Sequence, residues 1–387
     1  MRSVSIIGGG LTRFDERWDA SFRELVVEAG LAAVQDAQIE GKEIQAVYGG
    51  CMSSGRLAGQ EHVGALLADF LGLNPIASTR CEAACASGGV ALRSGYLAVA
   101  SGMYDVVAVG GVEKMTDFDA ADVAVALGGA GDQENELFFG ATFPALYALM
   151  ARRHMLDYGT TEEMMASCSV KNHANAVENP YAQYRNKITI EEVMGSGPIA
   201  TPLKLLDCSP ITDGAAAVIL CASERARKYC KEPVEVIASA QASDSIALAN
   251  RKSMTELAAT KVAAADAYRQ AGLAPKDIDV AEVHDCFTIA EIMAIEDLGF
   301  FPKGAGGRAS LDGETALNSK VSINTSGGLK ACGHPVGATG VKQAVEIYWQ
   351  LKGRAGKRQA RDAKVGMTHN VGGSGATAVV HLYRRLR

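Results

Sequence analysis

The sequence predicts an α/β protein built from two similar halves. Three observations support this fold class. Strand-like and helical segments alternate along most of the 387 residues. The order of segments in the second half repeats that of the first, and a strand near the end of each repeat leads to a pair of glycines. The segment 213–220 is rich in small apolar residues, which suit a sheet that is buried on both faces.

In the first half, an N-terminal strand is followed by an amphipathic helix. Ser21 precedes this helix and Glu24 lies three residues further on, which is the spacing of a capping box. The glycines that end the first strand do not complete a Gly-x-Gly-x-x-Gly fingerprint, so no dinucleotide site is expected there. The predicted segments are strand 3–8, helix 21–37, strand 44–48, helix 63–71, a helix that begins near Cys85, and strand 106–109.

The character of the sequence changes between residues 114 and 201. This stretch has scattered methionines and aromatic residues, turn signals at Asn179-Pro180 and Gly197-Pro198, and no strand periodicity. We interpret it as an insert of helices and loops over one end of the first half, in which the methionines either fill a core or line an acyl chain. The predicted units are residues 1–232, which include the insert, and residues 233–387.

The second half repeats the alternation of the first. Its predicted segments are strand 234–239, helix 255–271 closed by Gly272, strand 277–283, helix 341–351 and strand 364–368. His284 directly follows a strand, and His334 lies in a turn of small residues that opens a helix. If the two halves meet face to face, Cys85 and His334 lie at equivalent helix starts near a pseudo-twofold axis. That arrangement would bring a thiol and an imidazole together.

Composition and charge exclude several classes of function. The net charge of −6 argues against nucleic acid as a partner, and no apolar run reaches the length that spans a bilayer. The first residues form too short an apolar stretch for a signal peptide and the last three are not a peroxisomal signal, so we expect a cytoplasmic protein. The nine cysteines form no Cys-x-x-Cys pair, which predicts reduced thiols and no metal site.

Cys85 precedes small residues that lead into an apolar helix containing several glycines. Glycines in a helix make sense where the helix is packed tightly on all sides. A thiol in the first turn lies near unpaired N–H groups, whose partial positive charge favours the thiolate and nucleophilic chemistry. The alternative is that Cys85 is a small core residue, as most buried cysteines are.

The chain resembles the thiolase family over essentially its whole length. The motifs that carry the resemblance are Cys85–Gly88, Gly110–Met115, Asn179–Gln183, Asp213–Ala217, His284-Asp285-Cys286-Phe287 and Gly327–Ala338. The His-Asp-Cys-Phe form, in place of Asn-Glu-Ala-Phe, is similar to the branch that holds sterol-carrier-protein-type and archaeal thiolases. The resemblance implies a thiolase-like fold, in which two duplicated α/β halves form a five-layered αβαβα core with an inserted loop domain.

The resemblance also implies three catalytic roles. Cys85 would attack an acyl-CoA thioester and carry the acyl group. His334 would take the proton of the thiol and return a proton to the departing CoA. His284 would hold the thioester oxygen of the second substrate, where enolate charge appears during carbon–carbon bond formation.

A second acid/base must move the α-proton, and thiolases commonly use a cysteine in a C-terminal Cys-x-Gly motif. Here the matching segment reads His369-Asn370-Val371 and holds no cysteine. Cys286 is the replacement that the resemblance implies, with His369 as a residue that faces the substrate or supports the site. The backbone N–H groups of Cys85 and Val371 would form the oxyanion hole.

These roles imply condensation of two acetyl-CoA to acetoacetyl-CoA and CoA, feeding hydroxymethylglutaryl-CoA and mevalonate synthesis. One alternative is a degradative 3-ketoacyl-CoA thiolase for longer chains. Another is a subunit that needs a complex with hydroxymethylglutaryl-CoA synthase and a small adaptor protein. A condensing enzyme that acts on acyl-carrier protein is weaker, because an acidic chain lacks the basic surface that an acidic carrier favours. The resemblance further implies a homodimer or homotetramer, acyl-CoA as substrate, and no cofactor apart from the coenzyme A of the substrates.

Overall fold

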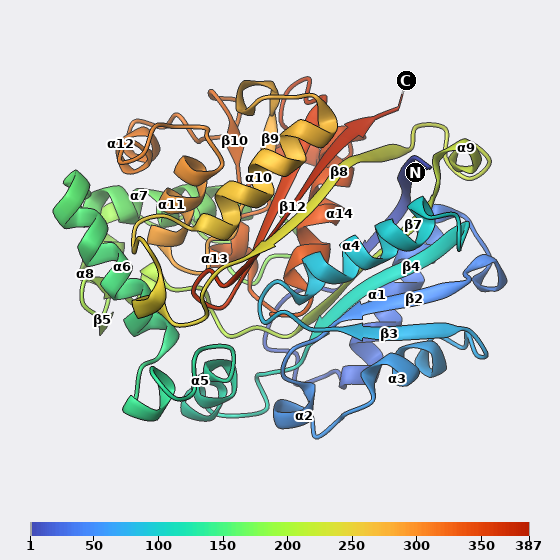
Figure 1. Ribbon diagram of the computed structural model, residues 1–387, viewed down its shortest axis with the longest axis horizontal. Coiled ribbons are helices and arrows are strands. Elements are labelled where there is room, and N and C mark those ends of the chain that lie inside the picture. The colour runs from blue at the N-terminus through green and yellow to red at the C-terminus, as the bar shows by residue number, and fades with distance from the viewer. Residues whose placement is uncertain (1, 387) are drawn as a thin grey trace.

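The computed structural model describes residues 2–386. Within them, ten strands form one mixed sheet in the order β10-β9-β11-β12-β8-β1-β7-β4-β2-β3 (Figure 1). The first half contributes β1 (Val4–Leu11), β2 (Ala46–Gly50), β3 (Ala77–Cys81), β4 (Val106–Glu113) and β7 (Gly214–Ala222). The second half contributes β8 (Val234–Ser243), β9 (Val280–Glu282), β10 (Ser322–Ile323), β11 (Val365–Gly372) and β12 (Thr377–Arg385).

The two halves of the sheet have the same topology. In the first, β2 pairs in parallel with β3 and β4, and β7 runs antiparallel between β4 and β1. In the second, β9 pairs in parallel with β10 and β11, and β12 runs antiparallel between β11 and β8. The halves join where Ser5 and Ile6 of β1 pair with Glu235 and Val234 of β8. The predicted duplication is therefore confirmed.

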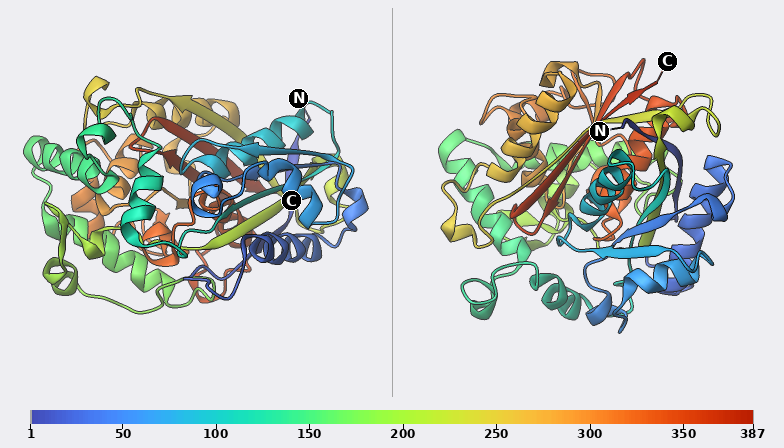
Figure 2. Two further views of the ribbon diagram at one scale, coloured as in Figure 1. Left: turned by 90° about the horizontal axis from the view of Figure 1, so that it is seen from below. Right: turned by 45° about the vertical axis from the view of Figure 1, so that its right-hand side comes forward.

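Helices cover both halves of the sheet and fill the space between them. The larger helices of the core are α1 (Phe22–Ala37), α3 (Val63–Phe70), α4 (Ser87–Ala100), α10 (Ala258–Ala271), α11 (Thr288–Asp297) and α14 (Thr339–Leu351). In the first half, α1 packs on β1 and β7 and α3 on β2 and β3, whereas α10 packs on β8 and β12. Between the half-sheets, α4 and α14 contact strands of both (Figure 2). This arrangement is the predicted five-layered αβαβα core.

The shorter helices of the core connect these elements. They are α2 (Ser54–Leu57), α9 (Ser223–Ala226), α12 (Gly306–Leu311) and α13 (Gly328–Cys332). Most predicted helices begin and end close to the expected residues. The Ser21 capping box is present, because its hydroxyl accepts the Glu24 N–H and the Glu24 side chain accepts the Ser21 N–H. The predicted closure at Gly272 is also present, with φ of 64°.

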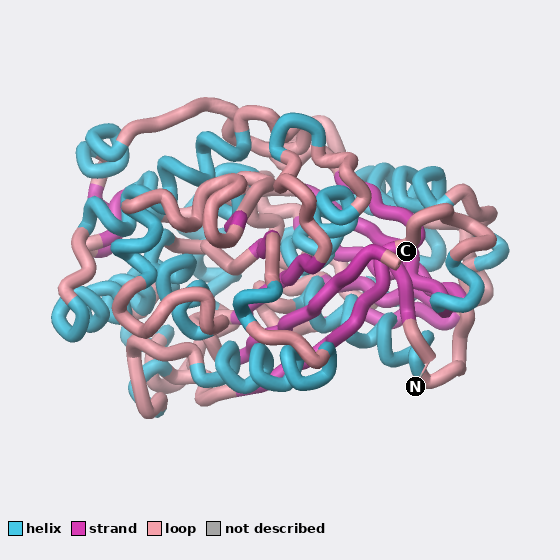
Figure 3. Tube along the Cα trace, turned by 90° about the horizontal axis from the view of Figure 1, so that it is seen from above, coloured by secondary structure: helices cyan, strands magenta, loops and turns pink. Residues whose placement is uncertain are grey.

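The stretch between β4 and β7 is mostly helix and loop, as Figure 3 shows at the end of the molecule away from the sheet. It holds α5 (Ala120–Gly128), α6 (Phe143–Tyr158), α7 (Glu162–Ala176), α8 (Ile190–Gly195) and a hairpin of β5 (Pro198–Ala200) and β6 (Leu203–Lys204). The helices α6 and α7 pack against α11 of the second half. The division into units 1–232 and 233–387 stays a prediction.

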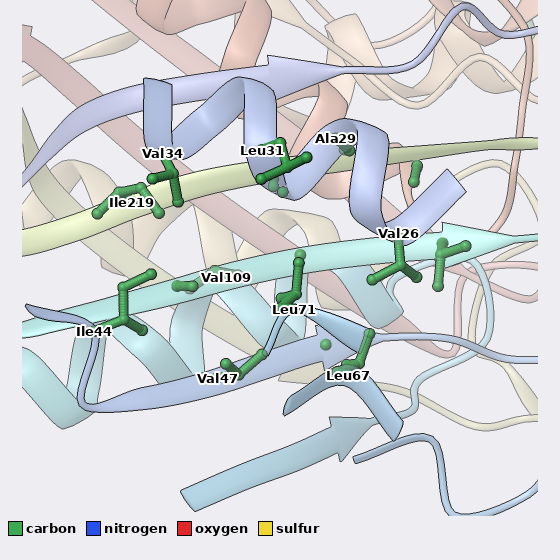
Figure 4. Close-up of a pocket in the computed structure, with 18 of the residues that line it drawn as sticks. Val26, Ala29, Leu31, Val34, Ile44, Val47, Leu67, Leu71, Val109 and Ile219 are labelled. Carbon is green, nitrogen blue, oxygen red and sulfur yellow. The ribbon is translucent and has the colours of Figure 1, made fainter. Parts of the chain in front are cut away.

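A hollow of about 270 Å³ lies between α1 and the outer face of the first half-sheet. Among the residues that line it, Figure 4 labels Val26 and Val34 of α1 and Val47 and Ile219 of the strands. Among the described residues, those that line it are Gly, Ala, Val, Leu and Ile. The space stays open because the facing residues of β4 and β7 are small. This lining offers no polar side chain for chemistry, and the hollow lies on the face of the sheet opposite α4.

Within residues 2–386, none of the helices has both the length and the apolar character needed to cross a membrane.

Candidate active site

Cys85 lies in a tight turn between β3 and α4. Ala84 has φ of 53°, in the left-handed region that residues with a side chain rarely adopt. Ser87 holds the turn closed, because its hydroxyl donates to the Ala84 carbonyl at 2.6 Å and accepts the Ala83 N–H at 3.0 Å. The thiol is half-buried, so a substrate can reach it. A strained turn held by side-chain hydrogen bonds is common at functional sites.

The prediction that Cys85 is a thiolate in the first turn of a helix is wrong in two respects. Cys85 does not lie in the first turn of α4, because Ser87 is the first helical residue and Ala86 is its N-cap. Burial also raises the pKa of the Cys85 thiol to about 12, although the N–H groups of Gly373 and of Cys85 itself lower it. The nucleophile is therefore a thiol at neutral pH. It needs a base within reach.

His334 is held in one orientation by two threonines. Its backbone N–H donates to Thr212 Oγ1 at 3.0 Å, and its Nδ1 lies 2.7 Å from Thr339 Oγ1. The Thr339 hydroxyl donates to the Pro335 carbonyl, so its oxygen accepts a hydrogen bond from Nδ1–H of the histidine. The proton on Nδ1 leaves Nε2 as an acceptor. That atom is buried and has no partner among the described residues.

The imidazole of His334 is also neutral. Burial, together with the positive charge of Lys342, lowers its pKa to about 3. A neutral ring with a free Nε2 is the form that accepts a proton from a thiol.

Three of the predicted residues converge. The sulfur of Cys85 and one ring nitrogen from each of His284 and His334 lie within 4.8 Å of one another. The two imidazole rings stand edge to face with centroids 5.2 Å apart. Such a set also meets the spacing that a metal ion would need, and the absence of a metal site stays a prediction.

Asn370 fixes the tautomer of His284, and the sequence did not single it out. Its Oδ1 accepts the Gly89 N–H at 3.1 Å and its Nδ2 donates to the Cys85 carbonyl at 2.9 Å, so the backbone determines which way the amide faces. Nδ2 also lies 3.3 Å from His284 Nδ1, which must therefore accept. The ring proton then sits on Nε2, which is buried without a partner in the described part of the chain and is available to donate.

Burial lowers the pKa of His284 well below its usual value, with further lowering from His334 and His369. The two histidines therefore present opposite groups to Cys85. His334 offers an acceptor and His284 offers a donor. One can move the thiol proton while the other holds a substrate oxygen.

Cys286 lies on the second-half side of the site, two residues after His284. Burial raises the pKa of its thiol well above the usual range, and a negative charge on Cys85 would raise it further. The two sulfurs are thus close enough for a charge on Cys85 to oppose ionisation of Cys286. Tyr147, from α6 of the insert, lies in the same buried cluster as Cys286, and its hydroxyl lowers the pKa of the Cys286 thiol. Tyr147 was not predicted, because a single tyrosine in a helix carries no sequence signal for such a contact.

Asp285 anchors the loop that carries His284 and Cys286. Its carboxylate accepts the N–H groups of Leu329 and Lys330 at 2.7 and 3.2 Å, at the start of α13. Asn172 of the insert donates to the same carboxylate at 2.7 Å. The loop is thereby fixed to the segment that leads to His334.

His369 and Val371 are not among the residues that converge on the Cys85 sulfur. The His369 Nε2 is 2.8 Å from Thr260 Oγ1 of α10, so the ring faces the outer helix layer, whereas its neighbour Asn370 faces α4. Val371 is paired with Ala378 in the β11–β12 ladder. The N–H that contacts the Cys85 sulfur from this strand's end belongs to Gly373, two residues beyond Val371.

Close backbone packing brings the two halves of the site together. A Cβ atom on Gly88 would lie 2.7 Å from the Gly337 carbonyl, and one on Gly337 would lie 2.7 Å from the Gly50 carbonyl. The buried Glu113 carboxylate accepts N–H groups from Ser53 and Gly337 at 2.9 Å each, which joins the end of β2 to the His334 turn. Any larger residue at these glycines would push His334 away from Cys85.

The arrangement can carry out acyl transfer through a cysteine. It contains a protonated nucleophile, a neutral base, an N–H donor for a developing oxyanion, and a second thiol close to the first.

Comparison with known proteins agrees with this chemistry. Residues 4–224 match the family model of the thiolase N-terminal domain, and residues 240–385 match that of the thiolase C-terminal domain-like family. An acetyl-CoA acetyltransferase of Methanothermobacter thermautotrophicus is 57% identical over 385 residues, which cover 100% of both chains. The protein of the same name from Methanocaldococcus jannaschii is 52% identical over 99% of each chain. Sterol carrier protein 2 of Oryctolagus cuniculus is 35% identical over 98% of this chain and 72% of that protein.

Two solved structures have the same fold. A chain of the Ltp2-ChsH2(DUF35) aldolase superposes with a TM-score of 0.85 and 25% identity, over 98% of this chain and 97% of that one. Acetyl-CoA acetyltransferase from Syntrophomonas wolfei superposes with a TM-score of 0.77 over 100% of both chains, and its 16% identity bears on the fold alone.

Proposed function

Because this chain belongs to the thiolase family of acyltransferases, we propose that it joins two acetyl-CoA molecules into acetoacetyl-CoA and CoA, and catalyses the reverse thiolysis. The observation that carries the proposal is the convergence of the Cys85 sulfur with the rings of His284 and His334, whose Nε2 atoms have no partner among the described residues. The relatives named acetyl-CoA acetyltransferase support acetyl as the acyl group.

In the first step, His334 Nε2 takes the proton of Cys85 as the sulfur attacks the thioester carbonyl. The carbonyl oxygen gains negative charge, and we assign its hydrogen bonds to the N–H groups of Cys85 and Gly373, which both contact the sulfur. The sequence had indicated Val371 for the second donor. When the tetrahedral intermediate breaks down, the C–S bond to CoA is lost and His334 returns the proton to the CoA sulfur.

In the second step, a thiolate at Cys286 removes a proton from the α-carbon of the second acetyl-CoA. The enolate oxygen is held by Nε2–H of His284, and the enolate carbon attacks the acyl group on Cys85. The Cys85 sulfur leaves as a thiolate and takes from Cys286 the proton that came from the α-carbon, which leaves Cys286 a thiolate again. An acylated Cys85 cannot ionise, so it carries no negative charge that would oppose the Cys286 thiolate.

The first test is thiolysis of acetoacetyl-CoA by free CoA, followed as loss of substrate. We expect rapid turnover by the wild type and none by Cys85→Ala, with an unchanged circular dichroism spectrum. A Cys286→Ala variant should still form the acyl-enzyme from acetyl-CoA but fail to condense it. Equal turnover by wild type and Cys85→Ala would exclude this mechanism.

The second candidate is a thiolase for longer 3-ketoacyl chains. It has the same chemistry, and the insert, which packs around Cys286 and Phe287, would set the chain length. Turnover compared across 3-ketoacyl-CoA substrates of increasing length separates the two. Loss of activity beyond four carbons would remove the degradative function.

We also propose that the protein works with others in its host. The Ltp2-ChsH2(DUF35) aldolase, which contains a similar chain, is named for two proteins, and this favours a partner here. The proposed setting is supply of acetoacetyl-CoA to a cytoplasmic hydroxymethylglutaryl-CoA synthase and mevalonate synthesis, by a homodimer or homotetramer without a further cofactor. Co-purification from the host tests this, and a lone homo-oligomer with full activity would contradict dependence on a partner.

A further inference from the structure

We infer that Tyr147 is a positioning residue whose hydroxyl stabilises the thiolate of Cys286 during removal of the α-proton. The inference rests on the proposed function of Cys286 and adds a residue from the insert to the chemistry. Three contacts of the buried Tyr147 side chain support it.

The first contact fixes the ring. Tyr147 is 1% exposed, and its ring packs on that of Phe287 with centroids 4.6 Å apart. Phe287 follows Cys286 in the chain, so the aromatic pair sets the distance between the hydroxyl and the sulfur. Buried aromatic pairs of this kind hold their geometry well.

The second and third contacts involve the hydroxyl. It donates to the Gly373 carbonyl at 3.2 Å, and it lies beside the thiol of Cys286 in the same buried cluster and lowers the pKa of that thiol. The N–H of Gly373 contacts the sulfur of Cys85. Tyr147 and Gly373 therefore form a chain of polar contacts from the second thiol to the nucleophile.

A tyrosine hydroxyl has one proton to give. In the resting site the Gly373 carbonyl receives it, at a distance that is long for an O–H···O hydrogen bond. When Cys286 ionises, a small rotation about the C–O bond turns the same proton toward the sulfur. A hydrogen bond to an anion in a dry site is about twice as strong as one to a neutral acceptor. The hydrogen bond formed with the thiolate is therefore stronger than the one given up at the Gly373 carbonyl.

The electrostatic surroundings make this donor necessary. A negative charge on Cys85 or on Asp285 opposes the thiolate of Cys286, and Arg251 is a cation whose charge acts on Tyr147. His284 and His334 are neutral and supply no positive charge. The Tyr147 hydroxyl and the N–H of Phe287 favour the ionised form of the sulfur.

The test uses Tyr147→Phe, which removes the hydroxyl and keeps the ring that packs on Phe287. We expect acylation of Cys85, measured as the burst of CoA released from acetyl-CoA, to stay within twofold of wild type. Exchange of the acetyl methyl protons with deuterated solvent requires the Cys286 thiolate, and we expect it to fall by about tenfold or more. Raising the pH should recover part of the loss, because more Cys286 then ionises.

The matched control is Tyr348→Phe. The Tyr348 hydroxyl is also buried and also donates to a backbone carbonyl, that of Ile7 at 3.0 Å, but it lies away from both catalytic cysteines. This variant should lose a comparable amount of thermal stability and keep wild-type exchange. Normal exchange in Tyr147→Phe, or an equal loss of acylation and exchange, would overturn the inference.

A second readout does not depend on the proposed function. In a Cys85→Ala background, iodoacetamide alkylates Cys286 through its thiolate, and peptide mass spectrometry distinguishes it from the other cysteines. We expect Tyr147→Phe to slow this alkylation by about tenfold and to shift its pH profile upward. If Cys286→Ala retains exchange, the assignment of Cys286 as base fails while the alkylation shift still reports on Tyr147. If alkylation is unchanged, Tyr147 does not stabilise the thiolate.

Discussion

At the scale of single residues, the roles of the two active-site histidines follow from their neighbours. Thr339 directs the His334 proton to Nδ1, and Asn370 directs the His284 proton to Nε2. The sequence predicted both histidines because each lies in a motif. It could not predict Asn370 as a contact, because the amide reaches a carbonyl 285 residues away in the chain.

Asn370→Asp should reverse the tautomer of His284. A carboxylate accepts a hydrogen bond from Nδ1–H of His284. The single ring proton then sits on Nδ1, and Nε2 becomes an acceptor that cannot donate to the enolate oxygen. We expect condensation to fall by about 100-fold or more, as for loss of one oxyanion donor. The condensation rate measures this, and ¹⁵N chemical shifts of the His284 ring report the tautomer.

Asn370→Gln is the matched control, because it keeps an amide and tests the effect of altered packing alone. A His284 ring that keeps its Nε2 proton in Asn370→Asp would contradict the role of Asn370.

At the scale of elements, α14 and the segment before it connect the active site to a buried ion pair. Lys342 of α14 lies 3.0 Å from Glu282 at the end of β9, and both side chains are at most 1% exposed. Ser326 contacts both groups, and Lys342 donates to the Gly328 carbonyl at 3.2 Å. The pair thus ties the strand that leads to His284 to the turn that carries His334.

We expect Lys342→Met to lower the free energy of unfolding by about 3–5 kcal/mol, because Glu282 is left buried without its cation. Urea unfolding at neutral pH measures the change. Lys357→Met is the control, since that lysine pairs with Glu178 on the surface and should contribute at most about 0.5 kcal/mol. A Lys342→Met variant as stable as this control would show that Glu282 takes up a proton or water at little cost.

The sequence predicted most elements at this scale but not all. The glycines of α4 correctly indicated a helix enclosed on all sides, since a Cβ atom on Gly95 would lie 2.4 Å from the Val109 side chain. The start of α4 was misplaced because Ala84 and Ser87 set the turn through local hydrogen bonds. Strand β3 was missed because it lies at the sheet edge and is partly exposed, so it lacks an apolar pattern.

At the scale of the whole molecule, the site is assembled from both halves and the insert. The duplicated order of segments was enough to predict the fold, and the motifs were enough to predict that Cys85, His284 and His334 converge. The contribution of Tyr147 could not be predicted, because nothing in the alternation of segments says where the helices of an insert will pack.

Buried histidines make stability depend on pH. Burial lowers the pKa of His334 and His369 to about 3 and of His381 to about 4, all below the value in an unfolded chain, roughly 6.5. Below that unfolded value the unfolded state binds more protons than the native state. The native state therefore loses stability as the pH falls from about 6.5 toward 4, by up to about 1.4 kcal/mol per pH unit for each histidine.

Urea unfolding between pH 7 and pH 5 checks this expectation. His369→Gln should reduce the slope, because one buried histidine is removed, whereas the exposed His62→Gln should leave it unchanged. A free energy of unfolding that is constant over this range would contradict the neutral, buried state of these rings.

The narrow seam between β1 and β8 has a practical consequence. Because two residue pairs join the half-sheets there, the halves are held together mainly by the α4 and α14 layer and by the packing of α6 and α7 on the second half. A gene cut in the loop near residue 232 would yield two fragments, one with Cys85 and one with His334, each inert alone. Co-expressed, they should reassemble and regain turnover, so that thiolysis would report association of the fragments and the enzyme could serve as a split reporter.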